Sequence, residues 1–184
     1  MNNQNNNQNN NQNNNQNSDR LNKVIKSLEK IPNETKQMVF TMAQNMSEIE
    51  IIQSFNQQAQ DLFNFMIAVI KRLNKEKEFN VTGYKTLFEN AIKINAKLPL
   101  DKFTLTILEF AAEIYAEDEN CFLNMSIPDT QVNFNNEFGL IRSEMFKKMW
   151  LLSSKKDRAD VTDIMILLTT FAHAYLYKTI LMTK

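Results

Sequence analysis

The stretch that decides the fold is SEIEIIQSFNQQAQDLFNFMIAVIKRLNKEK, residues 47–77. Ser47 and Glu50 have the spacing of a capping box, which marks the start of a helix. No Gly or Pro follows within the stretch. Its apolar residues recur in steps of three and four, a heptad pattern typical of a coiled-coil seam, at Ile52, Phe55, Ala59, Leu62, Met66, Val69 and Leu73. The sequence therefore predicts one long central helix over residues 47–77.

The two halves of this helix differ in polarity. From Leu62 to Ile70 the sequence is apolar on nearly every side, which is typical of a helix buried in a core. The first half carries Gln at positions 53, 57, 58 and 60, beside the large side chains of Ile51 and Phe55. Amides do not repel one another as like charges do, so we predict that Ile51 and Phe55 bind a partner.

The rest of the chain predicts an all-α fold, a single helical bundle of about seven helices. Further helices are expected over residues 19–31, 33–46, 83–98, 102–115, 137–153 and from 161 to the C-terminus, with Thr82, Asp101 and Asp160 as three of the N-caps. Residues 117–138 show no sustained period and are expected to form a long loop. No alternation typical of strands persists anywhere.

The last predicted helix is the most apolar. Residues 164–177 contain no Lys, Arg, Asp or Glu. A membrane-spanning helix needs about 20 apolar residues, whereas this stretch includes Thr169, Thr170 and His173 and is followed by Lys178. We therefore expect a buried C-terminal helix and no membrane partner.

Composition excludes several classes of protein. The chain has 184 residues, 43% of them apolar, with 21 basic and 21 acidic side chains. Zero net charge argues against holding nucleic acid by bulk electrostatics. One Cys excludes a disulfide framework and a multi-Cys metal site. Two Gly cannot supply the loops of phosphate-binding enzymes, so no cofactor is expected.

The first 17 residues form a segment separate from the predicted domain of residues 18–184. Residues 2–17 are all Asn or Gln. Such a tract buries no apolar surface and is predicted to be disordered. Asn/Gln-rich segments also self-associate, so an inert tail and a tail that assists assembly are both open. No apolar signal-peptide core precedes residue 21, so we expect a cytoplasmic or nuclear protein.

Candidate catalytic and metal-binding residues form no recognisable constellation. Glu109, Glu113 and Glu117 recur every four residues, and we interpret them as a solvated face rather than an ion site. Cys121 has no basic neighbour that would lower the pKa of its thiol. His173 lies among apolar residues without a partner Ser, Cys or carboxylate, so a structural role is favoured. We predict no catalytic residue, no metal site and no enzymatic activity.

Two basic clusters and one aromatic pair are candidate binding residues. The clusters are Lys71, Arg72, Lys75 and Lys77, and Lys147, Lys148, Lys155, Lys156 and Arg158. If they converge in the fold, they could bind nucleic acid or anionic lipid; otherwise they are solvated helix ends, where cations are favoured. Phe146 and Trp150 lie one helical turn apart and suit either an interface or a core.

By exclusion, the sequence favours a non-enzymatic helical interaction protein, a subunit or adaptor of a cytoplasmic or nuclear assembly. Its expected partners are other proteins, with a second copy of the chain as one possibility. The alternative is a nucleic-acid-associated regulatory factor that uses the basic clusters at 71–77 and 147–158. Helical bundles carry unrelated functions, so the fold class alone does not decide between them.

Overall fold

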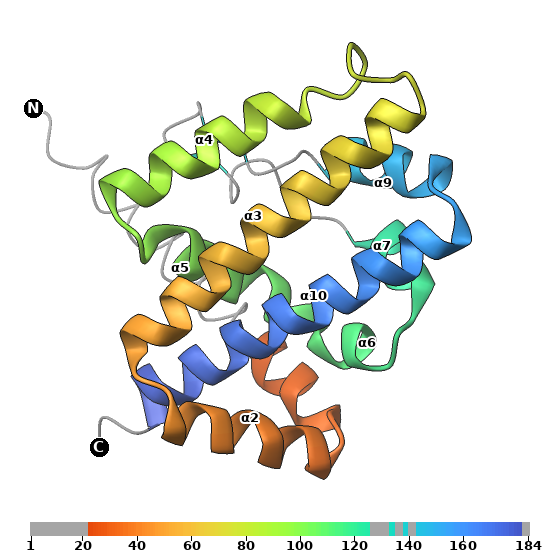
Figure 1. Ribbon diagram of the computed structural model, residues 1–184. Coiled ribbons are helices and arrows are strands. Elements are labelled where there is room, and N and C mark those ends of the chain that lie inside the picture. The colour runs from red at the N-terminus through yellow and green to blue at the C-terminus, as the bar shows by residue number, and fades with distance from the viewer. Residues whose placement is uncertain (1–21, 126–132, 135–137, 140–142, 182–184) are drawn as a thin grey trace, which may run out of the picture.

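The structure, a computed structural model, describes residues 22–125, 133–134, 138–139 and 143–181, and it confirms the all-α class (Figure 1). Residues 22–30 are helical, and the helices that follow are α2 (Asn33–Asn45), α3 (Glu48–Arg72), α4 (Val81–Ile94), α5 (Leu98–Ile107), α6 (Ala111–Tyr115), α7 (Glu119–Asn124), α9 (Ser143–Leu152) and α10 (Lys155–Leu176). A 3-10 turn, η1 (Leu108–Phe110), separates α5 from α6, and a π-helical turn, η2 (Tyr177–Leu181), follows α10. Strands β1 (Asn133–Phe134) and β2 (Phe138–Gly139) form one short antiparallel pair. The predicted Asn/Gln tail lies outside the described residues.

Helices α3 and α10 form the centre of the fold. They run antiparallel and lie side by side, with α4 flanking α3 and α2 flanking α10 (Figure 1). Both helices are buried over much of their length, and α10 also packs against α5 and α6. The central and C-terminal helices are therefore buried as the sequence predicts.

Helix α3 begins where the sequence predicts and ends earlier. Ser47 and Glu50 form the capping box, with Ser47 N–H donating to Glu50 at 2.7 Å. The helix ends at Arg72 rather than at Lys77, because Asn74 adopts a left-handed conformation with φ of 55°. Asn74 N–H donates to the Lys71 carbonyl and Lys75 N–H to the Ile70 carbonyl, the two hydrogen bonds of a Schellman motif.

Helix α10 starts earlier than predicted. Its N-cap is Ser154, which forms a capping box with Asp157, so the expected cap Asp160 lies inside the helix. At the other end, Lys178 Nζ donates to the carbonyls of Ala43 at 3.0 Å and Met46 at 2.7 Å. These bonds join η2, which follows α10, to the last turn of α2 and its C-cap. No helix among the described residues is long and apolar enough to cross a membrane.

The middle of the chain differs most from the prediction. Helix α4 is capped by Asn80, whose side chain accepts from Gly83 N–H at 3.1 Å, and not by Thr82. Helix α5 starts at Leu98, with a Pro in its first turn, so Asp101 is no cap. The expected loop over 117–138 contains α7, whose N-cap is Asp118.

Candidate functional site

The predicted interface on the first half of α3 is wrong. Ile51 is 0% exposed and Phe55 is 2% exposed. The ring of Phe55 packs against Phe103 of α5, with 5.1 Å between ring centroids, and Asn56 Nδ2 donates to the Ala96 carbonyl at 2.8 Å. Helix α5 and the turn before it cover this face, so Ile51 and Phe55 belong to the core.

The aromatic pair of α9 also faces inward. Trp150 is buried, and its ring lies 4.7 Å from that of Phe122 in α7. Phe146 is half-buried, 6.0 Å from Phe122. The pair therefore joins α9 to α7, and Trp150 is not available as a binding residue.

The glutamate stripe is not one solvated face, which corrects the sequence interpretation. Glu109 lies in η1, where the helix tightens, and Glu117 follows α6 in a left-handed conformation with φ of 55°. Glu113 is half-buried, and its Oε2 is buried without a hydrogen-bond partner in the part of the chain that the structure describes. No cluster of ligands for a metal ion occurs among the described residues.

The two candidate nucleophilic or basic groups are both held neutral. Burial, with Glu113 and Asp118 nearby, raises the pKa of the Cys121 thiol to about 12. Burial, with the positive charge of Lys36 nearby, lowers the pKa of His173 to about 4. Cys121, in α7, is therefore a thiol and His173, in α10, an uncharged imidazole at neutral pH.

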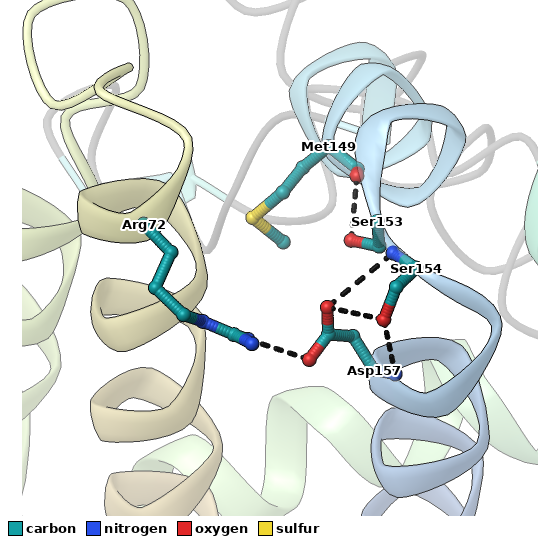
Figure 2. A network of polar contacts seen from close by, with 5 residues as sticks. All are labelled: Arg72, Met149, Ser153, Ser154 and Asp157. Atoms are coloured by element: carbon teal, nitrogen blue, oxygen red, sulfur yellow. Dashed lines mark hydrogen bonds and ion pairs between the residues drawn. The ribbon is translucent and has the colours of Figure 1, made fainter.

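The two basic clusters converge, which the sequence left open. Arg72, the last residue of α3, donates from Nη2 to Asp157 Oδ1 in the first turn of α10 at 2.5 Å (Figure 2). Asp157 Oδ2 accepts from the Ser154 hydroxyl at 2.7 Å. Burial alone would raise the pKa of Asp157, but the hydrogen bonds from Arg72 and Ser154 outweigh it and hold that pKa below its usual value. This network fixes the end of α3 against the turn between α9 and α10.

Several of the clustered cations already have partners. Lys75 pairs with Glu78 at 2.7 Å and Lys147 with Glu144 at 3.4 Å. Arg158 donates to the carbonyls of Trp150 and Leu151, which closes the C-terminal end of α9. These residues hold the local structure together rather than facing a ligand.

Three of the remaining cations lie close in sequence to two exposed leucines. Leu151 is 60% exposed and Leu152 is 45% exposed, at the end of α9. Lys148 lies one turn before them, and Lys155 and Lys156 begin α10; all three lysines are exposed. None of the three forms a salt bridge within the described residues. We call Lys148, Leu151, Leu152, Lys155 and Lys156 the basic corner.

Sequence reasoning missed the leucines of the basic corner. It counted Leu152 in the inward stripe of its helix, whereas the helix ends there and the chain turns into α10. The signal lies in the run KKMWLLSSKK, residues 147–156, where two lysine pairs flank two leucines. No acidic residue occurs within this run. Such a surface places exposed apolar area, which can mark an interaction site, between positive charges.

Comparison with known proteins gives one close relative. The chain is 59% identical over 163 residues to "Uncharacterized protein R465" of Acanthamoeba polyphaga mimivirus, covering 89% of this chain and 91% of that protein. No protein-family model matches the chain. No solved structure matches it either.

Proposed function

The chain belongs to the family of this mimivirus protein, and we propose that it is a non-enzymatic helical interaction protein, a subunit or adaptor of a cytoplasmic or nuclear assembly. The observation that carries the proposal is the basic corner, where Leu151 and Leu152 are exposed between lysines. Leucine side chains gain free energy when a partner covers them. The lysines select partners that present carboxylates or other negative charge.

A network of hydrogen bonds holds the helix ends that form the basic corner in fixed positions. Arg72, Asp157 and Ser154 hold the end of α3 and the start of α10 together (Figure 2). Arg158 closes the end of α9 through two backbone carbonyls. A surface that is already ordered loses less conformational entropy when it binds, which favours affinity.

Affinity purification of the full chain tests this function. The variant Leu151→Asn with Leu152→Asn should lose a protein that co-purifies in stoichiometric amount with the wild type. The matched control, Ile94→Asn with Leu167→Asn, removes two exposed apolar side chains, one from α4 and one from the middle of α10, and should retain that partner. Equal recovery with all three proteins would show that the basic corner is not the binding surface.

The alternative function, a nucleic-acid-associated regulatory factor, gains support from the convergence of the two basic clusters. Lys71, Lys148, Lys155 and Lys156 are exposed around one end of the bundle. Binding through phosphate contacts weakens steeply with salt. A labelled DNA or RNA oligonucleotide that binds the wild type, with lower affinity for Lys155→Glu with Lys156→Glu and a steep salt dependence, would favour this alternative.

A further inference from the structure

The two lysines that begin α10 lie where positive charge destabilises a helix. Cations are favoured at helix C-terminal ends, but Lys155 and Lys156 are the first two residues of α10, beside the positive end of the helix dipole. Both residues are exposed, and neither forms a salt bridge within the described residues. The stability of the fold therefore gives no reason for their charge, which favours a role in binding.

Further positive charge lies at the same end of the bundle. The ion pair of Arg72 with Asp157 holds the end of α3, which carries the exposed Lys71, against the start of α10 (Figure 2). Lys148 is exposed on α9. Asp157 is the acidic residue nearest in sequence to the run of residues 147–156, and it is buried, with its charge paired with Arg72. The basic corner therefore favours an anionic partner.

The exposed leucines distinguish between anionic partners. Leu151 is 60% exposed and Leu152 is 45% exposed. Interfaces with nucleic acid are polar and offer leucine little apolar contact. Consecutive residues of a helix point about 100° apart, so the two leucines do not form the single stripe with which a helix fits the groove of another protein. The boundary between the headgroups and acyl chains of a bilayer accepts apolar side chains without a matching shape.

We propose that the basic corner binds the surface of an anionic lipid membrane, with Leu151 and Leu152 inserted below the headgroups and the lysines in contact with them. The proposal rests on the proposed function for the binding surface and names the partner of that surface. Apolar insertion and attraction to anionic lipid together hold proteins on membranes, and the cytoplasmic leaflet supplies such lipid. Such binding needs no membrane-spanning helix, and the part of the chain that the structure describes has none.

Co-sedimentation of the full chain with lipid vesicles tests the role of charge. The wild type should bind vesicles of phosphatidylcholine mixed with phosphatidylserine, and not vesicles of phosphatidylcholine alone. Lys155→Gln with Lys156→Gln should bind at least about tenfold more weakly, because each lysine near an anionic surface contributes several-fold to the affinity. The matched control, Lys26→Gln with Lys93→Gln, removes two exposed lysines from residues 22–30 and from α4 and should bind as the wild type does.

The leucines are tested in the same assay. Leu151→Asn with Leu152→Asn should also bind at least about tenfold more weakly, because apolar insertion is lost. Ile94→Asn with Leu167→Asn should bind as the wild type does. Melting temperatures separate binding from folding: the lysine variant should be no less stable than the wild type, because it removes positive charge from the start of α10.

Three results would overturn membrane binding. The first is a wild-type chain that does not bind phosphatidylserine vesicles at low salt. The second is binding that the lysine and leucine variants of the basic corner retain in full. The third is a DNA oligonucleotide that binds more tightly than the vesicles and is unaffected by loss of the leucines, since the partner would then be nucleic acid.

Affinity purification tests the proposed function separately. If the wild type does not bind vesicles but the leucine variant loses a co-purifying protein, membrane binding fails and the proposed function stands. Vesicle binding through the basic corner, with equal recovery of that protein by the leucine variant, would place the protein partner elsewhere on the molecule and leave membrane binding standing.

Discussion

At the scale of single residues, His173 is the most unusual group in the core. It is 0% exposed, and neither ring nitrogen has a hydrogen-bond partner within the described residues. Its ring packs between those of Tyr177, 4.6 Å away, and Tyr115, 6.3 Å away. Burial of an imidazole without partners disfavours its charged form. His173 is therefore uncharged at neutral pH, and its burial makes the stability of the fold depend on pH.

The burial of His173 predicts how stability depends on pH. The pKa of His173 falls from 6.5 to about 4 in the folded protein. The unfolded chain therefore takes up a proton at higher pH than the folded one, and stability declines as pH falls below 6.5. The loss should reach about 3 kcal/mol and level off below pH 4. In urea unfolding across this range, His173→Leu should not show this loss of stability. The same pH dependence in the variant and the wild type would contradict the role of His173.

Asp157 gives a second prediction at this scale. Unlike His173, it has hydrogen-bond partners that favour its charged form. Its pKa is lowered in the folded state, so its contribution is present at neutral pH and is lost as pH falls and the carboxylate is protonated. Asp157→Asn should reduce the free energy of unfolding by about 1 kcal/mol at pH 7, as the loss of a helix cap does. The difference between the two proteins should disappear in acid.

Arg72→Met removes the ion pair with Asp157 but leaves the capping box of Ser154 and Asp157, so it measures the ion pair alone. The Arg72 side chain is largely exposed, so its pair with Asp157 should contribute less than about 1 kcal/mol. Thermal unfolding that showed a larger loss for Arg72→Met than for Asp157→Asn would contradict this division of roles.

At the scale of helices, the core of α3 is more extensive than its sequence indicates. Met66 and Phe55 are both buried, although the amides around Phe55 suggested an accessible half. Met66→Ala and Phe55→Ala should each lower the free energy of unfolding by about 2–5 kcal/mol, as buried truncations do. Ile49→Ala, on the exposed side of the same helix, should cost less than about 0.5 kcal/mol in the same denaturant titration. If the Phe55 variant were as stable as the Ile49 variant, the placement of Phe55 in the core would be contradicted.

Helix starts and apolar stripes could be predicted where the signal is local. The capping box of Ser47 and Glu50 and the buried run from Leu62 to Ile70 both appear in the structure. The end of α3 was missed because the chain turns at Asn74, a left-handed residue other than Gly, and α4 ends before Asn95, whose backbone is extended. Asn tolerates the left-handed conformation, so the turn at Asn74 could have been recognised from the sequence. Which face of a helix is covered depends on α5 packing from a distant part of the chain, and no local pattern records that.

The basic corner could be predicted only in part, because local sequence shows its lysines but not the long-range contact that brings the two clusters together. The lysines stood out as two clusters, but their convergence depends on the contact between Arg72 and Asp157, which are 85 residues apart. Leu152 belongs to an apolar stripe by spacing but is exposed where α9 ends, whereas Leu151 lies on the helix face of Lys147 and Lys148. The sequence spacing alone therefore does not show that the two leucines are exposed together.

At the scale of the whole molecule, the described helices form one bundle, and the proposed binding surface lies at one end of it. The Asn/Gln tract should contribute nothing to the stability of that bundle. Deleting residues 2–17 removes no apolar side chain, so the melting temperature should stay within about a degree of that of the full chain. A fall of about ten degrees in differential scanning calorimetry would show that the tract packs against the helices.

The most direct test of the basic corner is hydrogen–deuterium exchange of the full chain, free and in its purified complex. We expect amide protection on binding over residues 148–158, the end of α9 and the start of α10, because a partner that covers Leu151 and Leu152 also excludes water from this turn. The outer face of α4, residues 81–94, should exchange equally in both states. Protection of α4 or α2 with an unchanged α9–α10 turn would contradict the proposal that the protein binds through the basic corner.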